Sequence, residues 1–375
     1  MRIAVNARFL LHNKLEGFGI VTDEVMQRMS RTHPEDKFDF YFDRKYHPRF
    51  VQQPNIIPHV YPPPTRLPIL MRWWLNQPVR KNVVRNKADV FFSPDGFIPL
   101  GMSVPKVSMF HDIAYLHHPE YLQTRIRKFY DRWVPRYMAY TTHIITVSEF
   151  SKKEIIEGYH VPADKITVVY NGITDGYKPL NEVQQAEARR QYTQGRPYFV
   201  YLGALHPRKN VLTLVKAFEQ FKSNASSDIQ LILAGRNAWH NNELFEAIEK
   251  SPFKKEIHLP GYVPTEQATS LVASAVAMIY PSLYEGFGLP LVEAMACGVP
   301  VIASNASSLP EVAGGAALLF EPMDVNQLSL HMQAIASDVS MRNEFIRLGV
   351  ERSKLFSWDR TAEQIYAVLE KVAGK

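Results

Sequence analysis

Residues 276–302 have the sequence VAMIYPSLYEGFGLPLVEAMACGVPVI, and this stretch determines the predicted fold class. It begins with a short apolar run that ends at Tyr280, which is typical of a buried strand. A loop with two glycines follows, and Pro290 suits the first turn of a helix. A second apolar run, at 299–303, closes the stretch. A strand, a glycine loop, a helix and a further strand together predict a parallel α/β sheet.

The same alternation runs through the whole chain in two series, separated by the polar stretch 174–197, which we interpret as a linker with a short helix. With 375 residues, two domains are expected. Ligands of open parallel sheets bind at the carboxyl ends of the strands, so functional residues should follow these runs. The expected strands are 3–5, 37–42, 90–92, 106–110, 143–147 and 166–170 in the first series, and 198–202, 229–234, 256–259, 276–280, 299–303 and 317–320 in the second.

Composition favours a folded protein of a reducing compartment. The chain is 46% hydrophobic and 21% charged, as ordinary globular proteins are. Its one cysteine, Cys297, excludes an intramolecular disulfide and a cysteine-based zinc site. The first residues, 1–6, predict a strand and not a signal peptide, and no apolar stretch approaches the roughly 20 residues of a membrane span. We therefore expect a cytoplasmic location.

Two carboxylates flank the predicted helix start at Pro290. Glu285 lies in the glycine loop, and Glu293 lies about one turn into the helix. The unpaired amide groups of a helix start favour a diphosphate, and glycines let a ligand approach the backbone. The two glutamates could then contact hydroxyl groups at two points along one ligand. The alternative is an ordinary loop and a proline-started helix with two solvated glutamates.

A second candidate site follows the strand at 198–202. Gly203 opens a loop that contains Arg208 and Lys209, and the helix-like segment 211–221 comes next. Two adjacent cations suit a pyrophosphate, because Arg binds it in a fork and Lys acts as a point charge. The alternative is a solvated pair at a helix start.

Two weaker signals lie in the first half. Gly17 and Gly19 precede the first helix, but they are not a dinucleotide fingerprint, because about ten residues separate them from the strand and Thr22 replaces the third glycine. His111 directly follows the strand expected at 106–110 and could form a hydrogen bond with a sugar hydroxyl. The alternative is a structural histidine followed by a capping Asp112. No cluster with reliable metal-ligand spacing and no P-loop is present in the sequence.

In their order along the chain, these segments resemble the retaining glycosyltransferases of family 4, which have the two-domain GT-B fold. Glu285 and Glu293 match the family's paired glutamates with seven residues between them, and the match extends over 285–302. Gly203 with 208–210 matches the family's phosphate-binding loop. Further segments that are similar to family signatures are 146–151, 169–172, 309–312 and 356–358.

The resemblance implies two Rossmann-like parallel-sheet domains that face each other across a cleft. The first, at 1–175, would be the acceptor-side domain and would be completed by the final helix at 357–375. The second, at 195–356, would bind the nucleotide sugar. Ser307 and Ser308 depart from the pattern, since relatives often have glycines there, and this leaves the contacts of that loop open.

The resemblance also implies roles for the candidate residues. Glu293 would hold the nucleotide ribose and Glu285 would contact the donor sugar. Arg208 and Lys209 would neutralise the leaving diphosphate, and no metal or other cofactor is expected. The remaining implied contacts are backbone groups at Gly203, Gly286, Phe287, Gly288 and Leu289 toward the donor, His111 beside the transferred sugar, and Gly17 and Gly19 along the cleft.

The implied activity is retaining transfer of a hexose-type sugar from GDP-mannose or a UDP-sugar to a glycan or lipid-linked acceptor in polysaccharide or cell-envelope biosynthesis. Fixed cations and helix-start amides would stabilise the leaving diphosphate, and the leaving phosphate would help to deprotonate the acceptor. A nucleotide-sugar epimerase or hydrolase of the same fold, and a non-catalytic sugar-nucleotide-binding subunit, remain alternatives. The missing fingerprint disfavours a dehydrogenase.

The basic charge is concentrated in the first half, where residues 1–180 contain 25 Lys and Arg against 17 Asp and Glu. Segment 66–87 combines six cations with many apolar residues. It could form an amphipathic surface for anionic lipid headgroups, which would suit a lipid-linked acceptor and a peripheral membrane location. The alternative is an ordinary helix that packs Trp73 and Trp74 into the core. No nucleic-acid recognition motif accompanies the charge.

Overall fold

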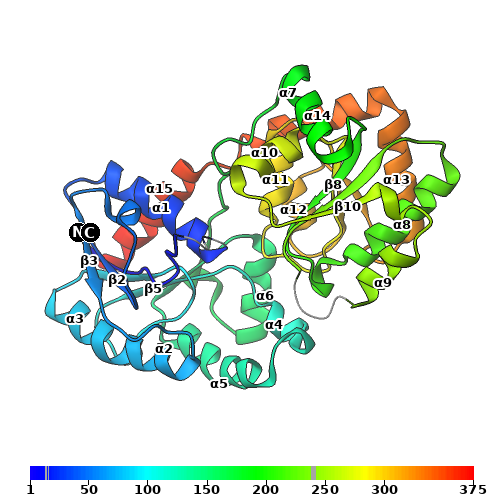
Figure 1. The fold of residues 1–375 in the computed structure, drawn as a ribbon. Helices are drawn as coiled ribbons and strands as arrows, with labels where there is room; N and C mark the ends of the chain where they lie inside the picture. The colour runs from blue at the N-terminus through cyan, green and yellow to red at the C-terminus, as the bar shows by residue number, and fades with distance from the viewer. Residues whose placement is uncertain (13–14, 16, 238–241) are drawn as a thin grey trace. The chain divides into compact units, whose positions relative to one another are not determined.

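The computed structural model describes residues 1–12, 15, 17–237 and 242–375, so Glu16 of the first glycine loop lies outside the described residues. The chain forms two compact units, Met1–Gly172 with Ser357–Lys375, and Ile173–Phe356. Each unit contains one fully parallel sheet with helices around it (Figure 1). The prediction of two parallel-sheet α/β units is therefore confirmed.

The sheet of the first unit has seven strands in the order β3-β2-β1-β4-β5-β6-β7. From β1 the chain builds outward to β3 and then returns to the other side of β1 with β4. The carboxyl ends of β1 and β4 therefore mark the switch point where an open sheet binds ligands. The strands are β1 (Arg2–Asn6), β2 (Lys37–Phe42), β3 (Ile56–Val60), β4 (Val90–Ser93), β5 (Lys106–Phe110), β6 (His143–Thr146) and β7 (Ile166–Val168).

The last helix of the chain belongs to the first unit, where it packs against the first helix (Figure 1). Thr361 Oγ1 donates to the carbonyl of Tyr170 at 2.7 Å. Gly172 is required beside this helix, because a Cβ there would lie 2.1 Å from the nitrogen of Trp358. The helices of this unit are α1 (Phe18–Thr32), α2 (Pro68–Trp74), α3 (Arg80–Arg85), α4 (Ala114–His117), α5 (Thr124–Tyr140), α6 (Glu149–Tyr159) and α15 (Trp358–Ala373), with 3-10 turns at Pro48–Val51, Pro119–Tyr121 and Ala163–Lys165.

One strand of the first unit was not predicted. β3 contains Pro58 and lies in segment 44–88, which has no Asp or Glu. Proline cannot donate to a ladder, so it lowers the expectation of a strand except at a sheet edge. β3 is the edge strand beside β2, which resolves the conflict.

Segment 66–87 was expected to form either an amphipathic surface or an ordinary helix that packs Trp73 and Trp74 into the core, and the structure agrees with each in part. Trp74 is fully buried, whereas Trp73 is 47% exposed, so the expectation that both tryptophans pack into the core is wrong for Trp73. A π-helical turn at Leu75–Val79 joins α2 to α3 and contains Pro78. Proline lacks the amide that a regular helix needs, and such turns absorb the missing bond.

The sheet of the second unit has six strands in the order β10-β9-β8-β11-β12-β13, so its switch point lies between β8 and β11. Segment 174–197, expected to be a linker with a short helix, belongs to this unit. The strands are β8 (Tyr198–Leu202), β9 (Gln230–Ala234), β10 (Ile257–Gly261), β11 (Ala277–Tyr280), β12 (Val301–Ser304) and β13 (Leu318–Phe320).

The helices of the second unit lie on both faces of its sheet (Figure 1). None of the helices in the described parts of either unit is long and apolar enough to cross a membrane. The helices are α7 (Glu182–Thr193), α8 (Val211–Asn224), α9 (Asn242–Lys250), α10 (Thr265–Ala273), α11 (Leu289–Ala296), α12 (Leu309–Ala313), α13 (Val325–Ser337) and α14 (Val339–Ser353), with 3-10 turns at Pro207–Lys209 and Lys254–Glu256.

Candidate active site

Two loops meet at the switch point of the second unit, one after β8 and one after β11. The amide of Leu283 donates to the carbonyl of Arg208 at 2.9 Å. The side-chain amide of Asn210 donates to the carbonyl of Pro281 at 3.1 Å. These bonds hold the loops that carry Arg208–Lys209 and Glu285 next to each other.

The loop after β8 has a tightly determined shape. A Cβ on Gly203 would lie 2.8 Å from the hydroxyl of Tyr201, so a side chain does not fit there. His206 Nδ1 accepts the amide of Arg208 at 3.1 Å and begins the 3-10 turn. Asn210 then takes the left-handed conformation, with φ of 54°, before α8 begins. The turn thereby directs two adjacent cations toward the loop that follows β11.

Glu285 meets both cations. Its Oε1 accepts a hydrogen bond from Lys209 Nζ, and its Oε2 lies 3.6 Å from Arg208 Nη1. The side chain of Glu285 is only 9% exposed. Burial alone would raise the pKa of this carboxyl, but the charges of Lys209 and Arg208 outweigh burial and lower the pKa to about 2. The group is therefore a fixed carboxylate at any physiological pH.

Both cations have further fixed partners. Lys209 Nζ lies 3.3 Å from the hydroxyl of Tyr280 and 5.4 Å from the centre of its ring. Arg208 Nη1 donates to the carbonyl of Tyr284. One carboxylate facing two cations leaves a net positive charge at the carboxyl ends of β8 and β11. That charge suits the developing negative charge of a leaving phosphate.

Helix α11 begins directly after this loop. Gly288 caps it with φ of 101°, and a Cβ there would meet Leu309 Cδ2 at 2.7 Å. Leu289 and Pro290 form the first turn, so the predicted helix start is confirmed. Phe287 is buried, with its ring edge-to-face against Phe356 at 5.5 Å between centroids. The first-turn amides of such a helix favour an anion.

Glu293 lies in α11 and differs from Glu285 in its charge state. Burial raises the pKa of its carboxyl to about 7, although hydrogen bonds with Thr174 and Tyr177 oppose the rise. The side chain has no cation among these causes, unlike Glu285. Glu293, for which the sequence suggested a ribose contact, therefore has a carboxyl group with a pKa of about 7. The alternative of two solvated glutamates is wrong, since Glu285 and Glu293 are both buried.

Sequence reasoning missed Thr174 and Tyr177, because they lie in a polar stretch that was interpreted as a linker. It also left the contacts of Ser307 and Ser308 open. Ser307 Oγ accepts the amide of Glu285 at 2.9 Å. Ser308 Oγ donates to the carbonyl of Glu285 at 2.9 Å and lies 3.1 Å from that of Phe287. The two serines therefore hold the backbone of the glutamate–glycine loop.

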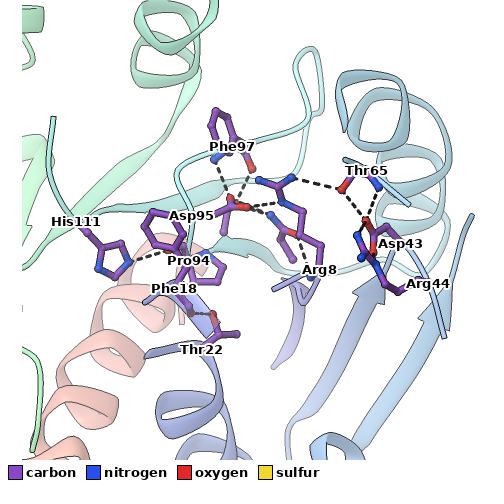
Figure 2. A network of polar contacts seen from close by, with 12 residues as sticks. Arg8, Phe18, Thr22, Asp43, Arg44, Thr65, Pro94, Asp95, Phe97 and His111 are labelled. Carbon is purple, nitrogen blue, oxygen red and sulfur yellow. Dashed lines mark hydrogen bonds and ion pairs between the residues drawn. The ribbon is translucent and has the colours of Figure 1, made fainter. Parts of the chain in front are cut away.

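In the first unit, His111 follows β5. Its Nε2 lies 2.9 Å from the carbonyl of Pro94 (Figure 2). A carbonyl only accepts, so Nε2 carries the proton and Nδ1 is the acceptor of the neutral ring. Burial lowers the pKa of the imidazole, which favours this neutral form. The ring of Phe18 lies 4.8 Å from the imidazole, centroid to centroid.

The other residues of the first unit that the sequence singled out have local structural contacts. Asp112 Oδ1 accepts the amide of Ala114 at 3.0 Å, although the N-cap residue of α4 is Ile113 and not Asp112. Gly17 caps α1 with φ of 46°. A Cβ on Gly19 would lie 2.7 Å from the carbonyl oxygen of Phe9, so that glycine allows close packing. His111, Gly17 and Gly19 belong to the first unit, and the other candidate residues belong to the second.

Among the described residues, one group of three has potential metal-ligand atoms close together, namely His33, Glu35 and Asp36. Asp36 already accepts hydrogen bonds from the amino terminus and from the hydroxyl of Tyr366. None of these residues follows a strand at a switch point. The group therefore lies outside the switch-point positions at which an open parallel sheet binds its ligand.

Two family models match the chain. The model of Glycosyl transferases group 1 matches residues 184–352, and the model of Glycosyltransferase Family 4 matches residues 29–176. O-antigen chain mannosyltransferase B of Escherichia coli is 34% identical over 276 residues, which cover 73% of this chain and 72% of that protein. The chain therefore belongs to glycosyltransferase family 4, and it is a glycosyltransferase.

Two further similarities agree with this assignment. The serotype-specific mannosyltransferase WbdA of Escherichia coli is 25% identical over 262 residues. The matched region covers 68% of this chain but only 32% of that longer protein. The crystal structure of Anabaena HepE in complex with UDP and glucose covers 98% of this chain and 99% of its own, with a TM-score of 0.76 and 18% identity. At that identity the match shows the fold, which is GT-B.

Proposed function

We propose that this glycosyltransferase moves a mannosyl group from a nucleotide-diphosphate sugar to a growing glycan or lipid-linked acceptor in polysaccharide biosynthesis. The names of its relatives, an O-antigen chain mannosyltransferase and a serotype-specific mannosyltransferase, support the sugar and the pathway class. The observation that carries the proposal is the contact of Glu285 with Lys209 and Arg208 at the switch point of the second unit.

Arg208 and Lys209 are proposed to bind the diphosphate and to stabilise the charge that develops as the sugar–phosphate bond breaks. Arg208 offers a forked donor and Lys209 a point charge. Glu285 holds both in place before the ligand arrives, so little reorganisation accompanies the reaction. The start of α11 adds its amide dipoles on the same side. No metal is required in this scheme, because fixed cations perform the charge neutralisation.

Glu293 is proposed to accept hydrogen bonds from the ribose hydroxyls. A carboxyl group with a pKa of about 7 has a bound proton in half of the molecules at that pH. Ribose hydroxyls donate well to the ionised form, so binding would favour the carboxylate and lower its pKa. Nucleotide affinity should then rise with pH through the neutral range.

His111 is proposed to bond a hydroxyl of the transferred sugar through its unprotonated Nδ1. We propose that the reaction retains the anomeric configuration by same-face displacement. The acceptor oxygen would form its bond to the anomeric carbon as the bond to the phosphate breaks, and the acceptor proton would pass to the leaving phosphate oxygen. A retaining glycosidase instead needs a close pair of carboxylates. Glu285 is unsuited to act as a nucleophile, because two cations already hold it.

The surface of α2 supports a peripheral contact with anionic membranes as part of this function. Ile69 is 65% exposed and Trp73 47% exposed, and Leu67 is also exposed. They lie in segment 44–88, which has nine Lys and Arg residues and no Asp or Glu. Sedimentation with vesicles that contain phosphatidylglycerol would test the contact, and Trp73→Ser combined with Ile69→Ser should weaken it.

The function is tested by incubating the chain with GDP-mannose, UDP-glucose or UDP-galactose and a mannose-containing oligosaccharide. Mass spectrometry would detect one added hexose, and proton NMR would show the anomeric configuration. The proposal predicts a mannosylated product with the donor's configuration. A product formed only from a UDP-hexose would show that the transferred sugar is that hexose and not mannose. A product with the inverted anomeric configuration would overturn the retaining mechanism.

A further inference from the structure

A pocket of about 530 Å³ opens in the first unit, at the carboxyl ends of β1 and β4. Three arginines line it, namely Arg8, Arg44 and Arg66. Among the described residues that line it, none is a carboxylate. The rest of the lining is largely apolar and includes Phe9, Phe97 and Met71. A cationic, partly aromatic pocket at a switch point is a candidate binding site.

Arg8 is held rigidly in this pocket. Its Nε donates to the Asp95 carboxylate at 2.6 Å, and its guanidinium lies 4.5 Å from the ring centre of Phe9 and 5.3 Å from that of Phe97. Asp95 also accepts bonds from Asn6 at 3.0 Å and from the amide of Phe97 at 3.1 Å. Figure 2 shows this network between β1 and β4. The buried carboxylate therefore orients the arginine from behind.

Arg44 is held in the same way. Its Nε and Nη2 both donate to the Asp43 carboxylate at 2.7 Å. Asp43 also accepts the hydroxyl of Thr65 at 2.7 Å, and Arg8 Nη1 lies 3.4 Å from that hydroxyl oxygen. Thr65 therefore joins the two arginine–aspartate pairs into one network (Figure 2). Two guanidinium groups with fixed positions are suited to one anionic group.

The charges of the pocket do not cancel. Asp95 and Asp43 have side chains no more than 1% exposed, and each faces one arginine. Arg66, the third cation, is exposed and forms no ion pair with any residue in the described part of the chain. A guanidinium has five donors, and the hydrogen bonds found within the described chain use two each of Arg8 and Arg44. The remaining donors and the net charge suit a phosphate, which accepts bonds from several arginines at once.

The apolar part of the lining continues toward α2 and α5. Pro68 and Met71 come from α2, and Ile126 and Phe129 come from α5. α2 also carries the exposed Ile69 and Trp73. A ligand with a phosphate at the arginines would therefore meet apolar surface next to it. The pocket fits an amphiphilic phosphate better than a free anion.

The pocket also adjoins His111. Phe18 lines the pocket, and its ring lies 4.8 Å from the His111 imidazole (Figure 2). We propose that this pocket binds the acceptor through a phosphate or diphosphate that is joined to an apolar group, with Arg8, Arg44 and Arg66 around the anion. The identification of this ligand as the acceptor substrate rests on the proposed function. The binding of an amphiphilic phosphate does not, because it is independent of turnover.

The test is the equilibrium binding of octyl phosphate, below its critical micelle concentration, by isothermal titration calorimetry. The variant is Arg66→Gln, because Arg66 is exposed and its replacement leaves the core intact. Arg85→Gln is the matched control, since Arg85 is an exposed cation of α3 outside the pocket and its replacement changes the net charge equally. Lys209→Gln reports on the nucleotide site of the second unit.

The inference predicts saturable binding that weakens about tenfold in Arg66→Gln and further in Arg44→Gln, as the loss of a bond to a charged group does. Arg85→Gln and Lys209→Gln should bind octyl phosphate as the wild type does. Inorganic phosphate should bind more weakly than octyl phosphate, and equal binding would overturn the apolar half of the proposal. Absence of binding, or equal loss in Arg85→Gln, would overturn all of it. Nucleotide binding that persists in Arg66→Gln and fails in Lys209→Gln would leave the proposed function standing in either case.

Discussion

Lys209 Nζ donates to Glu285 Oε1, although the two residues follow different strands of the second unit. β8 and β11 are separated by two strands in the chain but are neighbours in the sheet. A cation and a carboxylate from the two sides of the switch point thus form one buried pair. The pair fixes the position of charge where a parallel α/β sheet binds its ligand.

Replacing one partner of this pair should be costly. Lys209→Met leaves the buried Glu285 with one of its two cations, Arg208 at 3.6 Å, and should destabilise the fold by about 3 kcal/mol. The double variant Lys209→Met, Glu285→Gln should recover part of that loss, because no uncompensated charge remains. Urea denaturation of the four proteins of this cycle measures the coupling. Additive effects would contradict a direct interaction.

The same pair predicts an acid-dependent loss of stability. The pKa of Glu285 is lowered to about 2, so its contribution is present above the ordinary value of 4.5 and is lost as pH falls from there toward 2. In Lys209→Met the pKa should rise and the acid-dependent loss should shrink. Denaturation at pH 3, 4 and 6 compares the two proteins, and parallel curves would exclude the assignment.

Glu293 should show the opposite pH dependence. Its pKa is raised from 4.5 to about 7, so the folded state holds the proton more tightly and stability falls as pH rises from about 4.5 to 7. Glu293→Gln is a neutral isostere and should be more stable than the wild type at pH 8, by up to about 3 kcal/mol. The two should be nearly equal at pH 4.5. A constant difference across this range would show that Glu293 has an ordinary pKa.

Replacing Gly288 by a residue with a Cβ is predicted to destabilise the fold for steric reasons. It has φ of 101°, and a Cβ would lie 2.7 Å from the fully buried Leu309. Gly315 has φ of 83° with open space around it, so it is a control with similar backbone strain. Gly288→Ala should cost about 1–3 kcal/mol more than Gly315→Ala and should weaken nucleotide binding. Equal thermal midpoints for the two variants would contradict the predicted clash.

His111 should affect the transfer rate and leave nucleotide binding unchanged. His111→Phe keeps a ring against Phe18 but removes Nδ1, the proposed acceptor for a sugar hydroxyl. The rate should fall about 100-fold, with the nucleotide dissociation constant of the wild type. His111→Gln keeps polar atoms and should lose less. A stability loss of similar size in both variants without a rate effect would indicate a purely structural histidine.

The sequence predicted much of the second unit, for identifiable physical reasons. Tyr280, the loop glycines and Pro290 are local signals, and the structure has the strand, the turn and the helix start where these signals lie. The contact of Glu285 with Lys209 was not predicted, since it depends on which strands pair in the sheet. The order of the strands along the chain does not say which of them are neighbours in the sheet.

Other features depended on contacts that only the folded chain shows. β3 was missed because Pro58 is acceptable only at an edge, and the sequence does not say which strand is the edge. Trp73 and Trp74 are adjacent and equally apolar, yet one is exposed and the other is buried, because they point to different sides of α2. The arginine pocket joins residues of β1, β2 and β4 loops that are far apart in sequence.

The proposed nucleotide-sugar site is tested most directly by a thermal-shift titration of the wild type and Glu293→Gln with GDP, UDP, ADP and dTDP, without added metal. One nucleotide should stabilise the wild type, by about 2.7 kcal/mol when it is present at about 100 times its dissociation constant. The shift should be lost or much reduced in Glu293→Gln. If no nucleotide shifts the wild type, or if the variant shifts equally, the proposed nucleotide-sugar site in the second unit is wrong.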